Sequence, residues 1–318
     1  MESSNKIVES TILFKLSMGL PAQTKQAKSD SIAEYTGEGE GNLRPDEKSN
    51  KLVKNLFTNC AELEAIKKLN GNLSNKIRAI AVPSQNMFKD GLYLISLANV
   101  ERVNTYLESH AVRHAELKQA FIGRYFDLVA EQRGMLTVLF NEDDYDTAET
   151  VYNKITVSSN WIRMSFPDTE LQGVSMAIYE KESREFKEKI DRTADEVVAN
   201  LRLGTKAILD KMRYCLTVPK GEKPKAFRAS MIANSMEFIN FFRSNNFLKD
   251  SDLEEQVNRM NALLEGKDAD EFTRELKKNT TLREQTLAVV EDIRGSVVEM
   301  VARPVRSMVL RPKEKAGE

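Results

Sequence analysis

Two long stretches of the chain carry apolar residues at alternating steps of three and four positions. The first covers residues 98 to 140 and the second covers residues 168 to 216. The first stripe contains Val100, Val103, Leu107, His110, His114, Leu117, Phe121, Tyr125, Leu128, Met135 and Leu139. The second contains Leu171, Val174, Ile178, Phe186, Ile190, Ala194, Val197, Leu201, Ile208, Met212 and Cys215. This spacing places each set on one helical face, so it predicts two long amphipathic α-helices.

Two such helices bury their apolar stripes most simply against each other. The sequence therefore predicts a mainly α protein built on a long-helix, coiled-coil-like hairpin. An unbroken helix over residues 98 to 140 would be ~65 Å long, whereas a compact globule of this chain length has a diameter of ~50 Å. We therefore expect an elongated molecule.

Three short segments instead alternate apolar and polar residues with period two, which is typical of strands. In the segment TILFKLSMG, Ile12, Phe14 and Leu16 fall on one side of the chain. The segments LYLIS (92–96) and NWIRMSFP (160–167) follow the same rule. The three segments together predict a small antiparallel β-sheet.

Glycine, proline and charged runs divide the chain into four parts. Residues 1–46 are expected to be an N-terminal strand and a flexible acidic, glycine-rich loop, and residues 47–218 to be the hairpin with its sheet. The segment VPKGEKPKAFR then breaks the second long helix. Residues 219–302 are predicted to be a C-terminal helical bundle, and residues 303–318 form a basic tail.

Composition and charge favour a folded protein and exclude a strong overall electrostatic field. Hydrophobic residues make up 41% of the 318 residues, charged residues 30%, and the formal net charge is −1. Cys60 and Cys215 are isolated, the N-terminus lacks the layout of a signal peptide, and no apolar run is long enough to span a membrane. We therefore expect no membrane partner and a cytoplasmic location, in a bacterium or a phage-infected host, with a place in the virion left open.

His110 and His114 are the two histidines of the chain and lie four residues apart. In the metalloprotease helix H-E-x-x-H the glutamate is the general base for zinc-bound water, and here Ala111 takes its place. A pair without that base can still contribute two metal ligands. The leading interpretation is a buried seam between helices, and a metal-dependent hydrolase at His110 and His114 is the alternative.

Other catalytic signatures are missing from the sequence. GLPAQTK lacks the second glycine of a P-loop, NEDDYD lacks the glycine of a calcium loop, and no nucleophile elbow or zinc cluster is present. The sequence therefore predicts no cofactor and no enzymatic activity.

A basic segment lies at the break after the second long helix. Phosphates could be held by Lys211, Arg213, Lys220, Lys223, Lys225 and Arg228, together with the basic tail. Phe227 or Tyr214 is placed to stack on a base. Nucleic-acid binding through this segment is therefore a second functional alternative.

Several phrases of the sequence resemble a family known mainly as a domain of unknown function in phage and bacterial genomes. The resemblance extends over most of the chain and includes RAIAVPSQNMFKDGLYLISLANVERV, AFIGRYFDLVAEQ, LFNEDDYDTAETV, NWIRMSFP, KPKAFRASMIANSMEFINFF and LEEQVNRMNALLEG. Genes of that family often neighbour those of MoxR-type AAA+ ATPases and von Willebrand factor A proteins. The resemblance implies a non-catalytic companion of such a machine, and it transfers no site residues. The acidic glycine loop at 36–42 and the basic tail depart from the pattern.

The leading hypothesis is a non-catalytic interaction or assembly protein. Its expected partners are an AAA+ ATPase, a von Willebrand factor A protein or further copies of itself, and a phage-encoded assembly component is included in this class. Apolar stripes longer than a globule, with no chemistry attached to them, motivate this view.

Overall fold

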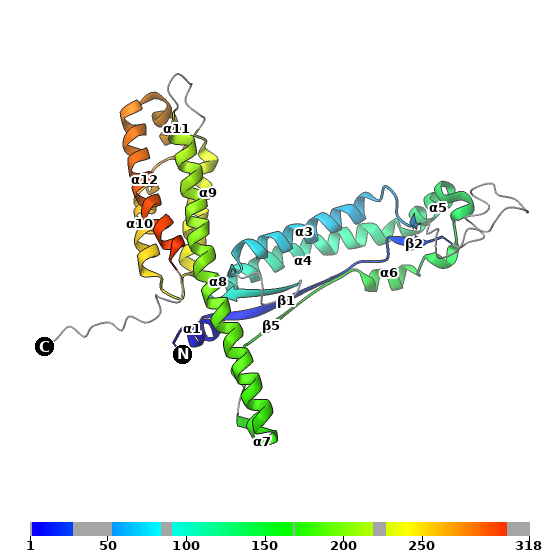
Figure 1. The fold of residues 1–318 in the computed structure, drawn as a ribbon. Coiled ribbons are helices and arrows are strands. Elements are labelled where there is room, and N and C mark those ends of the chain that lie inside the picture. The colour runs from blue at the N-terminus through cyan, green and yellow to red at the C-terminus, as the bar shows by residue number, and fades with distance from the viewer. Residues whose placement is uncertain (1, 28–52, 84–90, 168, 219–226, 304–318) are drawn as a thin grey trace, which may run out of the picture. The chain divides into compact units, whose positions relative to one another are not determined.

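The computed structural model describes residues 2–27, 53–83, 91–167, 169–218 and 227–303. Its chain divides into two compact units (Figure 1). Residues Met1–Phe14, Ile80–Val100 and Trp161–Glu318 form the first, called here the bundle unit, and residues Lys15–Ala79 and Glu101–Asn160 form the second, called here the α3–α4 unit. The chain passes between the units several times, so this division differs from the four consecutive segments expected from sequence. The loop at 36–42 and the tail from 304 lie outside the described residues.

The fold is mainly helical with a long helix and a small antiparallel sheet, which confirms the predicted class. Strands β1 (Thr11–Gly19), β4 (Leu92–Ser96) and β5 (Thr156–Ile162) form a sheet with the order β4-β1-β5. A separate antiparallel pair joins β2 (Thr24–Gln26) to β3 (Val53–Asn55). The strands expected at TILFKLSMG and LYLIS are confirmed. The third strand lies earlier than expected, because it ends at Ile162 and leaves Met164 to the bundle core.

Seven helices of the described chain belong to the bundle unit: α1 (Glu2–Ser10), α7 (Thr169–Val174), α8 (Met176–Leu216), α9 (Ala229–Asn245), α10 (Ser251–Leu264), α11 (Ala269–Lys278) and α12 (Thr280–Ala302). Four of them begin at a polar residue whose side chain accepts a hydrogen bond from a backbone N–H three residues later. The capping residues are Ser175, Asp250, Asp268 and Asn279. Local sequence therefore fixes where α8, α10, α11 and α12 start.

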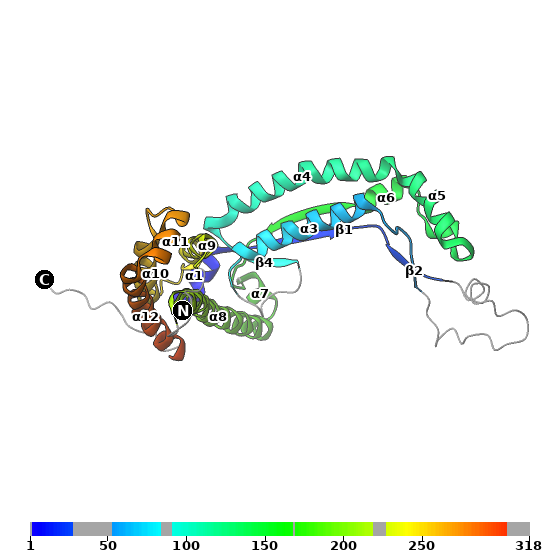
Figure 2. The ribbon, with the colours of Figure 1, turned by 90° about the horizontal axis from the view of Figure 1, so that it is seen from above.

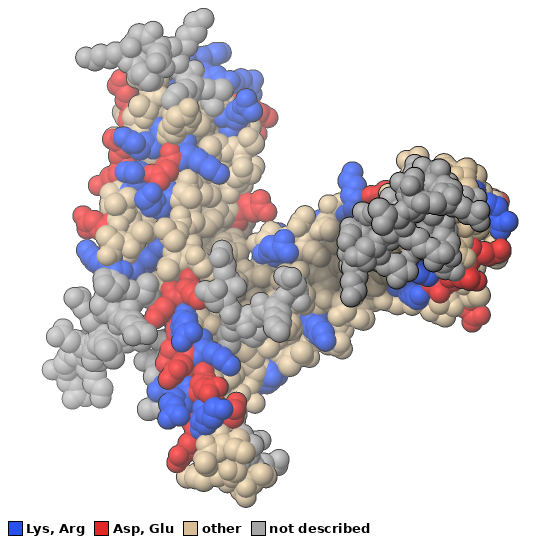
Figure 3. Space-filling view, turned by 45° about the vertical axis from the view of Figure 1, so that its right-hand side comes forward, with Lys and Arg blue, Asp and Glu red and all other residues tan. Residues whose placement is uncertain are grey.

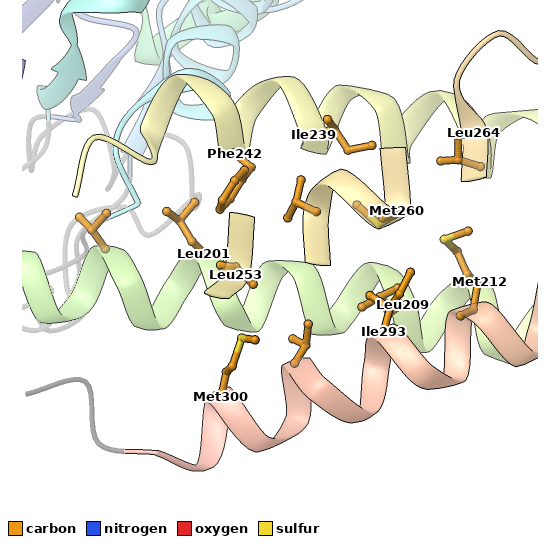
Figure 4. Packing of buried hydrophobic residues seen from close by; sticks show 14 of the residues in the cluster. Leu201, Leu209, Met212, Ile239, Phe242, Leu253, Met260, Leu264, Ile293 and Met300 are labelled. Atoms are coloured by element: carbon orange, nitrogen blue, oxygen red, sulfur yellow. The ribbon is translucent and has the colours of Figure 1, made fainter. Parts of the chain in front are cut away.

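The core of the bundle unit lies between α8, α9, α10 and α12, where their apolar faces meet (Figure 4). Leu209 of α8, Ile239 of α9, Val257 of α10 and Ile293 of α12 have no exposed surface. Gly204 of α8 allows α9 to approach closely, since a Cβ atom there would lie 2.8 Å from the Phe238 ring. The C-terminal helical bundle predicted from sequence therefore includes much of the second long helix.

This packing corrects the predicted hairpin. The buried stripe of α8, which includes Val197, Leu201 and Leu209, is filled by helices of its own unit, chiefly α12. Periodicity shows which face of a helix is buried but does not identify the helix that covers it. The first long helix belongs mainly to the other unit.

Polar contacts fix the direction of α12 along α8. Arg202 of α8 donates to the carbonyl of Met300 at 2.9 Å, near the end of α12. Arg283, near the start of α12, donates to the carbonyl of Leu216 at the end of α8, also at 2.9 Å. The two helices therefore run antiparallel, which places the two buried arginines at opposite ends of their contact.

The α3–α4 unit contains α3 (Ala61–Ile80), α4 (Val100–Gly123), α5 (Tyr125–Leu136) and α6 (Ala148–Lys154). Figures 1 and 2 show α3 lying alongside α4. Short 3-10 turns cover Leu97–Asn99, Thr137–Leu139 and Glu142–Asp144. The helix predicted over 98–140 is thus broken after Gly123, where the backbone of Arg124 leaves the helical region. A core that includes Leu63, Ile66 and Phe121 holds this unit together.

Candidate functional site

The N-terminal part of α8 differs from the rest of this 41-residue helix. From Ile190 onward its apolar stripe is buried, whereas most side chains between Met176 and Lys189 are exposed. Figures 1 and 2 show this part, called here the free half of α8, extending beyond the other bundle helices with α7 at its end. Phe186 packs edge-on against Phe166 with ring centroids 5.1 Å apart. One face of the free half is therefore partly covered and the other meets solvent.

Three large apolar side chains are exposed where α7 meets α8. The exposed fractions are 81% for Val174, 51% for Met176 and 50% for Ile178, and the three are called here the apolar tip. Ser175 separates α7 from α8, and its hydroxyl accepts a hydrogen bond from the backbone N–H of Ile178 at 3.4 Å. Figure 3 shows an uncharged surface at the end of this projection, next to mixed acidic and basic side chains. Grouped exposed apolar side chains of this kind mark interaction sites more often than isolated ones do.

Sequence reasoning placed Val174 and Ile178 in the buried stripe, and the structure corrects this. The break at Ser175 leaves Val174 in α7, outside the continuous helix, and Ile178 lies near the start of α8, before the buried stripe begins at Ile190. Met176 was not recognised as a site residue at all. The signal available in the sequence was the serine cap after Gly173, which marks a helix start inside the predicted span.

His110 and His114 lie on α4 and are both buried, with exposed fractions of 5% and 8%. Their rings stack with centroids 5.2 Å apart, and Nε2 of His110 lies 2.9 Å from Oδ1 of Asn70 on α3. Within the described chain, Nε2 of His114 has no hydrogen-bond partner. The arrangement is that of a seam between helices, as the leading interpretation expected. No group of three histidine, cysteine or acidic side chains suited to a metal occurs in the described residues, so the metal-dependent hydrolase stays a hypothesis that no contact supports.

We expect the stability of the α3–α4 unit to fall when the pH drops from about 7.5 to about 5.5. Burial lowers the pKa of both imidazoles below the usual 6.5, and the charge of His114 lowers that of His110 further, as Lys118 does for His114. Between the lowered pKa and 6.5 the unfolded chain binds more protons than the folded chain. The free energy of unfolding therefore decreases as the pH falls through this window, and the two histidines add no pH dependence above it.

Urea denaturation at the two pH values measures this effect, with the variant H110Q/H114Q as the control. That variant contains no histidine, because the chain has two. Asp144 and Glu62, whose pKa values are lowered, titrate at more acidic pH and do not contribute in this window. Equal pH dependence in the variant and the unaltered protein would contradict the prediction.

The basic segment is only partly within the described structure. Lys211 and Arg228 are exposed, and Arg213 pairs with Glu291 at 3.1 Å. Lys220, Lys223 and Lys225 lie outside the described residues. Phe227, suggested to stack on a base, is fully buried in the bundle core and is unsuited to that role, whereas Tyr214 is 63% exposed. The structure thus brings together only part of the predicted nucleic-acid site.

Asp144 lies within the acidic segment NEDDYD, and basic side chains form ion pairs with its carboxylate. Its carboxylate pairs with Lys25 at 3.0 Å and with Lys54 at 2.5 Å, and Lys54 also donates to the carbonyl of Leu139. Burial raises the pKa of Asp144, but the hydrogen bonds and charges of the two lysines outweigh it and hold the pKa below its usual value. The two lysines therefore neutralise the carboxylate that a calcium loop would use as a ligand.

Comparison with known proteins identifies no relative, since no family model, no curated protein and no solved structure matches the chain. Among the helices that the structure describes, none is both long and apolar enough to span a bilayer. The candidate site is therefore defined by the structure alone. It consists of the apolar tip and the free half of α8, where large apolar side chains and charged side chains are exposed next to each other.

Proposed function

We propose that this chain is a non-catalytic interaction and assembly protein that docks a protein partner through the apolar tip of α8. The observation that carries the proposal is the exposure of Val174, Met176 and Ile178 together at the end of a helix whose other half is anchored in a core. Exposing three large apolar side chains to water is unfavourable, by roughly 25 cal/mol for each Å² of apolar surface. A partner that covers them gains this free energy.

The anchoring of α8 in the bundle core also favours docking at the tip. Met176 and Ile178 are carried by the continuous helix α8, and Leu201, Leu209 and Met212 anchor the same helix in the bundle core. A rigid support reduces the conformational entropy lost on binding. The mixed charges beside the tip supply the polar rim that surrounds the apolar centre of many interfaces.

The partner we propose is a MoxR-type AAA+ ATPase or the von Willebrand factor A protein encoded with it. This choice rests on the resemblance of the chain to a family found in that genomic setting. Nucleic-acid binding through Lys211 and Arg228 stays an alternative, and it predicts an affinity that falls steeply with salt.

The test measures binding of the purified chain to a purified MoxR-type ATPase by fluorescence anisotropy or calorimetry. We expect the variant V174S/M176S/I178S to bind at least about tenfold more weakly, because interface centres depend on a few apolar anchors. The matched control is L203S/V289S, which replaces side chains that are 48% and 38% exposed elsewhere on the bundle. Unchanged affinity of the tip variant, or failure of the unaltered chain to bind any such ATPase or von Willebrand factor A protein, would overturn the proposal.

A further inference from the structure

The charged residues of the free half of α8 follow a mirror pattern. Residues 180–189 read EKESREFKEK, and the midpoint of this segment lies between Arg184 and Glu185. Every charged residue on one side of the midpoint has a residue of opposite charge at the same distance on the other side. The mirror pairs are Glu180 with Lys189, Lys181 with Glu188, Glu182 with Lys187, and Arg184 with Glu185.

These charges lie on a surface that the described structure leaves open. Lys181, Arg184 and Glu188 are exposed, and the side chain of Glu185 is 44% exposed. With about 3.6 residues per turn, these four residues share the face of α8 opposite Phe186 and Ile190. Among the described residues, the segment forms a single ion pair, between Lys181 and Glu185 at 3.9 Å. Most of its charged side chains therefore form no ion pair with the described part of the chain.

We propose that a second copy of this chain packs antiparallel on this face of α8, about a two-fold axis that passes between Arg184 and Glu185. Such an axis brings each residue of one helix to the height of its mirror residue on the other. Lys181 then lies opposite Glu188 of the second copy, and Arg184 opposite Glu185, so each contact occurs twice. An isologous interface needs this kind of self-complementary surface.

The orientation and register follow from the same pattern. A parallel pair in register would place each charged residue at the height of the same residue in the other copy, where like charges repel. An antiparallel pair shifted toward the C-terminus by half a turn would set Glu185 opposite Glu188. Ala177 and Arg192 lie at the two ends of the face, and the methylene groups of Arg192 can cover Ile178 of the other copy. The antiparallel arrangement centred on Arg184 and Glu185 is therefore favoured.

This inference rests on the proposed function and deepens it, because it names a second copy of the chain as one partner of the free half of α8. The contacts are exposed ion pairs, which are individually weak and are screened by salt. We therefore expect a reversible dimer that forms at high protein concentration and low ionic strength.

The test uses two variants of the full chain in sedimentation equilibrium. The acidic variant K181E/R184E has carboxylates at all four of positions 181, 184, 185 and 188, and the basic variant E185K/E188K has cations at all four. Each variant alone is expected to lose self-association, with a dissociation constant at least about tenfold weaker. An equal mixture is expected to form a heterodimer, because the carboxylates introduced into the acidic variant then face the ammonium groups introduced at the mirror positions of the basic variant.

The control separates this pairing from general attraction between oppositely charged proteins. A mixture of K277E/K278E with E275K/E284K carries the same charge differences at exposed positions of α11 and α12, and it is expected to gain no heterodimer. The proposal is overturned if the unaltered chain stays monomeric up to about 500 μM at low salt. It is equally overturned if the variants self-associate normally, or if the control mixture associates as well as the test mixture.

The same variants distinguish the two proposals. ATPase binding depends on Val174, Met176 and Ile178, which the charge variants retain. An unaltered chain that stays monomeric but binds the ATPase overturns only the dimer, whereas a chain that dimerises but binds neither the ATPase nor the von Willebrand factor A protein overturns only the docking function.

Discussion

Replacing Arg202 with methionine is expected to lower the free energy of unfolding of the bundle unit by about 3 to 5 kcal/mol. The guanidinium is 1% exposed, pairs with Asp250 at 2.8 Å and donates to the carbonyl of Met300 at 2.9 Å. It therefore joins α8 to the start of α10 and the end of α12. Its removal leaves a buried carboxylate and a buried carbonyl without their cation, and losing one partner of a buried pair is costly.

Urea denaturation followed by circular dichroism measures this change. The control is Lys211→Met, an exposed position of the same helix, which is expected to leave the midpoint unchanged. The double variant R202M/D250N is expected to be more stable than the two single changes predict by addition, because it removes both charges of the pair. Additive effects would show that Arg202 and Asp250 do not interact in solution.

Replacing Arg283 with methionine is expected to cost about 2 to 4 kcal/mol. Arg283 is 4% exposed, and it donates to the carbonyls of Leu216 at 2.9 Å and Cys215 at 2.5 Å. The last carbonyls of a helix have no partner within the helix, and a cation at that end also interacts favourably with the helix dipole. Burial lowers the pKa of Arg283 from its usual value, in keeping with a cation held away from water.

The matched control is Arg213→Met, one turn before the end of α8. Arg213 pairs with Glu291 at 3.1 Å, but both side chains are about half exposed, and such surface pairs contribute about 0 to 1 kcal/mol. Chemical denaturation of both variants under the same conditions compares them. A loss for Arg283→Met no larger than that for Arg213→Met would mean that the carbonyls of α8 are satisfied by water instead.

The sequence predicted the features of the fold that depend on local pattern. Apolar spacing located α8, and period-two alternation located β1 and β4, because each signal is contained within a few turns or residues. It missed α1, which has a short and mainly polar sequence. It also could not show that α8 packs against α12, since that choice depends on complementarity between segments far apart in the chain.

The buried arginines illustrate the same limit within the core. In a local pattern Arg202 and Arg283 look like solvent-facing positions between apolar residues. Their partners lie 48 and 98 residues away for Arg202, at Asp250 and Met300, and 67 residues away for Arg283, at Leu216. Only the tertiary structure brings these groups together, so no window of sequence contains the information.

Only part of the candidate site was predicted from the sequence. The preference for an interaction surface over catalysis came from apolar stripes without reactive groups, and it stays a prediction. The residues at the tip were misassigned, because periodicity extended the buried face through Val174 and Ile178 across the break at Ser175. The histidine seam was located correctly on one helix, and its contact with Asn70 could not be derived from spacing.

The division of α8 into an anchored half and a free half has a consequence for how the molecule can evolve. Substitutions between Met176 and Lys189 change side chains that contribute little to folding, so most of them are tolerated thermodynamically. Substitutions from Ile190 onward meet a dense core and are selected against. Recognition properties of the free half can therefore diverge rapidly between descendants of this protein while the scaffold that presents them is inherited unchanged.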